Sequence, residues 1–254
     1  MFRKVFIAIV VAAASSLASA SERTGKTDHN WQLIDQQRSD QHCFTQGFTL
    51  IDGIFFSSCG GYGQSYLSAS PLQGNRQKQV QLPRSIFAEG LTEHRGQLYL
   101  LSWKQRQAFK FSKELKLLER YHYNREGWGL SSNGEHLIAS DGSHHLYFLD
   151  PASFATVKKI AVQYRGKALP NINELEWVNG YLWANVWHDP HIYQIDVERA
   201  EAIERWDMSA LTPAQQSHNR EAVLNGIAWD KQRRAFWLTG KLWPKRYLVQ
   251  LLSN

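Results

Sequence analysis

The chain has 254 residues, of which 43% are hydrophobic and 20% are charged, a globular balance that excludes wholesale disorder. The formal net charge at pH 7 is +6, but no basic run is interleaved with aromatic residues, so we expect no nucleic-acid binding. The length suits one large core or two small domains.

The first twenty residues have the pattern of an export signal. Arg3 and Lys4 form a basic start, an apolar run follows, and Ala18-Ser19-Ala20 is a small-residue cleavage site. The apolar run is too short for a membrane-spanning helix, which needs about 20 residues. We therefore predict a signal peptide at residues 1–20. The mature chain would be exported to the periplasm or the medium, without membrane attachment.

A short strand around residues 29–34 is expected first, and five copies of one unit follow. Each copy begins with a strand that carries a related motif, at residues 44–47, 87–90, 126–130, 173–177 and 224–229. The next strand follows a turn glycine in four copies, Gly53, Gly96, Gly134 and Gly180, with steps of 43, 38 and 46 residues. The fifth step is longer because residues 208–221 form a polar insertion, which we expect to be helical.

Third and fourth strands complete most copies. Units of about 40–45 residues with four strands each are typical of propeller blades. The fifth unit lacks its fourth strand, and the strand at residues 29–34 can complete it and so hide its unpaired edge. We predict that residues 21–254 form a single all-β domain, a five-bladed β-propeller with four-stranded blades, the last closed by an N-terminal strand. An irregular β-sandwich would not explain the repeat.

The two cysteines lie at the far ends of the first hairpin, whose turn contains Gly53. Pairing of its strands brings Cys43 and Cys59 close together, and a disulfide between them would stabilise the fold by about 3 kcal/mol in the chain-entropy model. The alternative is two buried free thiols. We expect no metal site, because no further ligands have suitable spacing.

Candidate functional residues lie at the starts of the first strands and the ends of the second strands, which meet at the mouth of a propeller channel. They are Gln46, Glu89, Glu126, Trp128, Asn173, Glu174 and Asn225 on first strands and Trp103, Asp141, Asn185, Trp187 and Lys241 after second strands. This mixture predicts a polar pocket with aromatic walls for a small polar ligand. Gln46 and Asn225 have a purely structural alternative, which is to satisfy backbone groups. Glu89 and Lys241 are costly to bury without a task.

Ten motifs between residues 42 and 250, including those listed above, together resemble the plant- and bacterial-type glutaminyl-peptide cyclotransferases. The resemblance implies a five-bladed propeller that converts the N-terminal glutamine of a peptide into pyroglutamate, releases ammonia and needs no cofactor. It implies an active-site set of Phe44, Gln46, Phe87, Glu89, Trp103, Trp128, Asn173, Trp187 and Lys241. The family usually has Glu-Ser-Thr-Gly where Ser57-Ser58-Cys59-Gly60 stands, so both cysteines are departures in one hairpin.

We expect Glu89 to shuttle a proton, and Lys241 and Asn173 to donate hydrogen bonds to a developing oxyanion. The aromatic residues of the set would bind the substrate and exclude water. The expected partners are peptides or proteins with N-terminal glutamine, and the expected state is a monomer. The alternatives are a non-catalytic peptide-binding propeller, an inactive family member, or a propeller glycosidase, which would need a second carboxylate such as Glu174.

Overall fold

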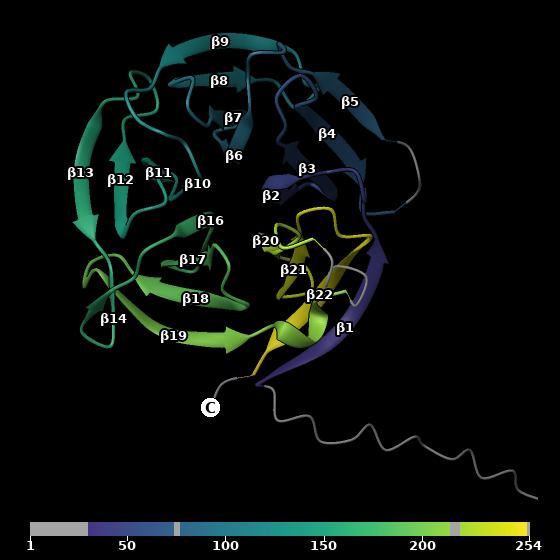
Figure 1. Ribbon diagram of the computed structural model, residues 1–254, viewed down its shortest axis with the longest axis vertical. Helices are drawn as coiled ribbons and strands as arrows, with labels where there is room; N and C mark the ends of the chain where they lie inside the picture. The colour runs from purple at the N-terminus through teal and green to yellow at the C-terminus, as the bar shows by residue number, and fades with distance from the viewer. Residues whose placement is uncertain (1–29, 74–76, 214–218, 253–254) are drawn as a thin grey trace, which may run out of the picture.

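The computed structural model describes residues 30–73, 77–213 and 219–252, and the predicted signal peptide at residues 1–20 lies outside them. Five β-sheets stand around a common centre, and each runs from an innermost strand near the axis to an outermost strand at the rim (Figure 1). The chain thus folds as the predicted five-bladed β-propeller. No helix in the described residues is long and apolar enough to cross a bilayer.

The first two blades are antiparallel sheets of four consecutive strands. Blade 1 contains β2 (Thr45–Ile51), β3 (Ile54–Cys59), β4 (Tyr66–Pro71) and β5 (Lys78–Gln81). Blade 2 contains β6 (Ala88–His94), β7 (Gln97–Ser102), β8 (Gln107–Phe111) and β9 (Leu117–His122).

The next two blades differ in size. Blade 3 contains β10 (Leu130–Ser132), β11 (Leu137–Ser140), β12 (His145–Leu149) and β13 (Thr156–Ala161). Blade 4 contains β16 (Ile172–Val178), β17 (Tyr181–Val186), β18 (His191–Asp196) and β19 (Glu201–Asp207). A small hairpin of β14 (Gln163–Tyr164) and β15 (Lys167–Ala168) adds to its outer edge, because β14 pairs in parallel with β19. Blade 4 therefore has six strands rather than the predicted four.

The last blade joins the two ends of the chain. It contains β20 (Leu224–Asp230), β21 (Ala235–Gly240) and β22 (Lys245–Leu251), and β1 (Trp31–Arg38) pairs antiparallel with β22 as its outermost strand. The pairing begins at Trp31 opposite Leu251 and ends at Arg38 opposite Lys245. This is the closure that the sequence predicted, and it covers an edge that would otherwise be open to association.

Tight turns connect the inner strands of three blades. The pairs Asp52-Gly53, Arg95-Gly96 and Asn179-Gly180 each have two successive residues with positive φ. Positive φ at both central residues defines the type I′ turn, whose twist matches that of the paired strands. The glycine at the second position takes this conformation without steric cost, which explains the repeat of turn glycines in the sequence.

The apolar core lies mainly between neighbouring blades. Phe56 and Leu67 of blade 1 pack with Leu91 and Leu98 of blade 2 in one buried cluster. At the junction between the last and first blades, the ring of Phe55 meets that of Trp237 edge to face, with 5.4 Å between ring centroids. Each blade is therefore stabilised by both of its neighbours.

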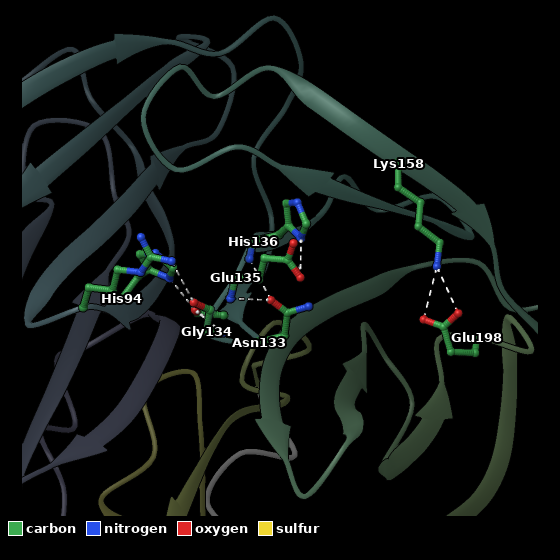
Figure 2. Close-up of polar contacts among 9 residues, drawn as sticks. His94, Asn133, Gly134, Glu135, His136, Lys158 and Glu198 are labelled. Carbon is green, nitrogen blue, oxygen red and sulfur yellow. Dashed lines mark hydrogen bonds and ion pairs between the residues drawn. The ribbon is translucent and has the colours of Figure 1, made fainter.

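Hydrogen bonds between the blades form a ring around the channel, with at least one at each junction. In blade order, the bonds are Ser58 Oγ to Glu89 O at 2.5 Å, Gly90 N to Trp128 O at 2.6 Å, Ser140 Oγ to Asn173 O at 2.8 Å, Gly226 N to Asn185 Oδ1 at 2.8 Å and Asn225 Nδ2 to Thr45 O at 2.8 Å. Further polar contacts lie away from the channel, such as the exposed ion pair of Lys158 and Glu198 between blades 3 and 4, with 3.3 Å between Nζ and Oε1 (Figure 2).

Glu174 ties three blades together within the channel. Its Oε1 accepts the N–H of Phe48 on β2 at 3.3 Å, and its Oε2 accepts the N–H of Ile227 on β20 at 2.9 Å. Burial raises the pKa of Glu174 well above its usual value, the neighbouring Glu176 carboxylate raises it further, and the two N–H donors oppose this shift. The side chain therefore has a structural role that its position in the sequence did not reveal.

The prediction of a helix over residues 208–221 is wrong for the described part of that segment. Only one 3₁₀ turn forms there, η1 (Ser209–Leu211), and residues 214–218 lie outside the description. The turn ends at Thr212, which is extended with ψ of 121°. Thr212 precedes Pro213, and a residue before proline is disfavoured in the helical conformation.

Replacing Glu174 with alanine is expected to lower the free energy of unfolding by about 2–6 kcal/mol. The substitution leaves two buried backbone N–H groups without an acceptor, and each such loss costs about 1–3 kcal/mol. Urea denaturation at neutral pH measures the change. Glu198→Ala, which removes only the exposed ion pair, should cost less than about 1 kcal/mol. Equal effects of the two variants would contradict the assigned role of Glu174.

Candidate active site

The nine residues of the predicted active-site set line one cavity of about 420 Å³. They come from the starts of innermost strands and from the segments after second strands, so they meet at one end of the channel. The cavity is lined by Phe44, Gln46, Phe87, Glu89, Trp103, Trp128, Asn173, Trp187, Glu221 and Lys241.

Irregular pairing at the starts of three innermost strands directs polar side chains toward the cavity. The pairing of the innermost strand shifts between Thr45 and Gly47, between Ala88 and Leu91, and between Ile172 and Leu175. Gln46, Glu89 and Asn173 each lie inside one of these shifts. A β-bulge re-aims a side chain that regular alternation would direct elsewhere, which places all three at the cavity.

Two glycines make room for the aromatic walls. A Cβ atom on Gly60 would lie 2.3 Å from the Phe87 ring, and a Cβ atom on Gly142 would lie 2.5 Å from the Trp128 ring. Both distances are far below van der Waals contact. Gly142 also has φ of +79°, which favours glycine. The positions of Phe87 and Trp128 thus depend on the absence of neighbouring side chains.

The aromatic residues form two groups around the polar centre. Phe87 contacts Phe44 and Trp103 edge to face, with centroid distances of 6.3 and 5.4 Å, and Trp128 contacts Trp187 edge to face at 5.8 Å. Such pairs are stabilising beyond their burial, by about 0.5–1.5 kcal/mol each. The walls are therefore rigid, which suits a pocket for a short aliphatic chain.

Glu126 holds two of the tryptophans in orientation. Its Oε2 accepts the indole N–H of Trp103 at 2.9 Å and that of Trp128 at 3.4 Å. The carboxylate is thus a positioning group behind the wall and does not itself line the cavity.

Glu89 is buried at the base of the cavity, with 5% of the residue exposed. Burial raises the pKa of Glu89 well above its usual value, the Lys241 ammonium lowers it, and the Glu126 carboxylate raises it. Among the described residues, its carboxyl group has no hydrogen bond or ion pair. A buried acid without a protein partner is unusual and points to a ligand that completes its contacts.

Lys241 is equally buried and its Nζ lies 4.7 Å from the centroid of the Phe44 ring. Burial lowers the pKa of Lys241, while the carboxylates of Glu89 and Glu221 raise it. The backbone N–H of Lys241 donates to Val223 O at 2.9 Å, which fixes the segment after β21. A cation and an acid therefore face the same cavity without forming a direct ion pair.

Two amides complete the polar surface. Asn173 is 2% exposed and its Oδ1 has no hydrogen-bond partner among the described residues. Gln46 Oε1 accepts Asn225 Nδ2 at 3.4 Å, a long bond that holds the amide plane loosely. Both groups can exchange hydrogen bonds with a small polar ligand.

Several candidate residues lie outside the cavity. Asn225, Asn185 and Glu174 satisfy backbone groups of other blades, so the structural alternative holds for Asn225. Asp141 Oδ1 accepts the N–H of Ser143 in a turn. Strand position alone did not separate these residues from the cavity set, because the same polar types occupy the same strand positions, whereas the set implied by the family resemblance left them out.

One residue of the cavity was missed by the sequence analysis. Glu221 has 48% of its side chain exposed, and its Oε1 lies 3.5 Å from Nε2 of His188. It belongs to the polar insertion before β20, where no repeat motif marks it. The described residues contain no group of three or more His, Cys, Asp or Glu side chains that could hold a metal ion.

The predicted disulfide between Cys43 and Cys59 is present, with 4.9 Å between the Cα atoms. It joins the segment before β2 to the end of β3, next to Phe44 on one side and Gly60 on the other. The backbone of this segment is also held by the blade-5 strand end, since Leu242 N donates to Cys43 O at 2.7 Å. The cross-link thus braces the wall of the cavity.

Comparisons with known proteins point to one family. A family model described as glutamine cyclotransferase matches residues 5–251. The chain is 33% identical over 226 residues to the glutaminyl-peptide cyclotransferase of Arabidopsis thaliana, and the match covers 87% of this chain and 71% of the relative. It is also similar to the crystal structure of Myxococcus xanthus glutaminyl cyclase, with 36% identity, a TM-score of 0.81, and coverage of 87% of this chain and 95% of the other.

Gly142→Ala is expected to displace Trp128 and to lower the free energy of unfolding by about 2–6 kcal/mol. Backbone strain at positive φ contributes about 1–3 kcal/mol, and overpacking against the indole about 1–3 kcal/mol. Gly134→Ala is the matched control, because Gly134 has φ of +89° and nothing within 4 Å of its Cβ position. Thermal denaturation and tryptophan fluorescence separate the two. An unchanged fluorescence spectrum in Gly142→Ala would show that Trp128 does not depend on this glycine.

Proposed function

This chain belongs to the glutamine cyclotransferase family, and on that premise we propose that it converts the N-terminal glutamine of peptides into pyroglutamate and releases ammonia. The proposal rests on the buried carboxyl of Glu89, which has no hydrogen bond or ion pair to a described residue and lies in an aromatic-lined cavity shared with Lys241. Since the predicted signal peptide precedes the domain and a disulfide is present, we propose that the enzyme acts after export, as a monomer.

The cavity binds the glutamine side chain folded back toward its own α-amine. The aromatic residues contact the aliphatic part and exclude water, while Gln46 and Asn173 exchange hydrogen bonds with the amine and the amide. Because both reacting groups belong to one residue, the enzyme needs no nucleophile of its own. Holding them in contact supplies the effective concentration that an intramolecular attack requires.

Glu89 transfers a proton from the attacking α-amine to the leaving ammonia. The α-amine must be neutral to attack, and its ordinary pKa is about 7.7–8.0. As the nitrogen bonds to the amide carbon, the Glu89 carboxylate accepts the proton that the nitrogen loses. It then gives this proton to the amide nitrogen as the carbon–nitrogen bond breaks and ammonia leaves. The carboxylate is regenerated and no proton is consumed.

Lys241 and Asn173 stabilise the oxygen of the tetrahedral intermediate. Negative charge develops on that oxygen, and preorganised donors in a dry cavity stabilise such charge strongly. The burial that lowers the pKa of Lys241 also keeps water from competing with this contact. A glycosidase mechanism finds less support, because the carboxylate of Glu174 is already bonded to two backbone N–H groups.

Glu89→Gln is expected to lower the turnover number by about 10²–10⁴-fold, because glutamine keeps the shape but cannot accept a proton. Ammonia release from a short peptide with N-terminal glutamine measures it. Binding of an unreactive analogue should persist. Glu135→Gln, at an exposed turn, serves as the control. Near-complete activity of Glu89→Gln would contradict the role of Glu89 in proton transfer. If the wild type released no ammonia, a non-catalytic peptide-binding function would be favoured.

Glu126→Gln is expected to move the acidic limb of the rate profile to lower pH. The Glu126 carboxylate raises the pKa of Glu89, so removing its charge lowers that pKa and keeps Glu89 ionised in more acidic solution. The base form of Glu89 is lost as the pH falls through its pKa, which contributes to this limb of kcat/KM beside the titration of the substrate amine, and the amine titrates alike with both enzymes. A pH profile measures it. A shift to higher pH, or none, would contradict the coupling.

A further inference from the structure

A second cavity of about 520 Å³ lies between the last blade and the first blade. Its lining includes Arg246 of β22 on one side, and Ser57, Ser68 and Ser70 of β3 and β4 on the other. Cys43 and Thr45 also border it, whereas the intervening Phe44 and the following Gln46 border the active-site cavity. The two cavities therefore share one wall but are distinct.

Arg246 brings a positive charge into this junction without a carboxylate partner among the described residues. Its Nε donates to Gln37 Oε1 at 3.3 Å, its guanidinium donates to Ser70 Oγ at 3.3 Å, and its Cζ lies 3.8 Å from the centroid of the Phe55 ring. Guanidinium has five N–H donors, so three have no partner in the described part of the chain. Burial lowers the pKa of Arg246 to about 10, which reflects the cost of holding its charge there.

Two serine hydroxyl groups face the same space. Ser57 and Ser68 stand directly opposite each other in the pairing of β3 with β4, so their side chains lie side by side. Neither hydroxyl has a hydrogen bond to any described residue, and Ser68 is only 6% exposed. The two serines and Arg246 line the same cavity, so together they offer unused hydrogen-bond donors to a ligand that binds there.

The other charged groups of the cavity lining are Arg38 and Asp40. Arg38 adds a second positive charge to the lining. The one carboxylate, Asp40, is engaged, because its Oδ2 accepts the hydroxyl of Tyr66 at 2.7 Å and its Oδ1 accepts the N–H of His42 at 2.9 Å. The lining thus carries a net positive charge and has free donors on two sides.

We propose that this cavity is a binding site for a tetrahedral oxyanion, sulfate or phosphate, held by Arg246 from blade 5 and by the hydroxyls of Ser57 and Ser68 from blade 1. Guanidinium pairs well with such anions because its planar fork donates two parallel hydrogen bonds. A tetrahedral anion presents further oxygens toward the serines on the opposite side. Binding would bridge the junction where the chain closes its ring.

Calorimetric titration of the mature chain with sodium sulfate and with inorganic phosphate, at constant ionic strength, tests the site. We expect saturable binding to one site in the wild type and at least about tenfold weaker binding in Arg246→Gln, since a hydrogen bond to a charged group is lost. Lys245→Gln is the matched control, because the neighbouring Lys245 is exposed and its loss changes the net charge equally. It should bind like the wild type.

A second variant keeps Arg246 and introduces a negative charge into the proposed anion site. Ser57→Glu places a carboxylate in the cavity, so it should abolish sulfate binding while the protein stays folded, even if Arg246→Gln does not fold. Unchanged sulfate affinity in Ser57→Glu or Arg246→Gln, or an absence of saturable binding in the wild type, would overturn the site. Acetate that binds as tightly as sulfate would overturn the assignment to a tetrahedral anion.

Discussion

The ring of hydrogen bonds between the innermost strands is the constraint on which the rest of the structure depends. Five short blades cannot close around a channel unless their inner strands approach closely, and buried backbone groups there need partners. The acceptors in this ring include the carbonyl groups of Glu89, Trp128 and Asn173, which are also residues of the cavity. The bonds that close the propeller thus also fix the backbone of the candidate active site.

The same constraint explains the charge arrangement. Glu174 and the asparagines satisfy backbone groups of the channel, whereas the side chains of Glu89 and Lys241 stay buried at the cavity without a hydrogen bond or ion pair to a described residue. Their burial shifts the two pKa values toward each other, which brings an acid and a base nearer to the pH at which a proton is exchanged. The aromatic side chains around the two groups and the disulfide beside the cavity wall hold this arrangement in place.

Much of the fold could be predicted because its signals are local and repeat. Turn glycines and strand motifs recur, so the blade count and the closing strand followed from the sequence. The hairpin of β14 and β15 could not be predicted, since two-residue strands have no periodicity. Which polar residue faces the cavity depends on the bulges: Asn173 lines it, whereas the adjacent Glu174 bonds to other blades. Glu221 lies in an insertion without a motif, so no sequence pattern marks it.

We propose that the cavity drives attack of an α-amine on the side-chain amide of the same residue. A short peptide that carries an isotopic label only in the side-chain amide nitrogen of its N-terminal glutamine tests this most directly. Mass spectrometry after incubation with the mature chain should find labelled ammonia and a cyclic, unlabelled peptide. An unchanged peptide, or a linear product with glutamate at its N-terminus, would contradict cyclisation by this cavity.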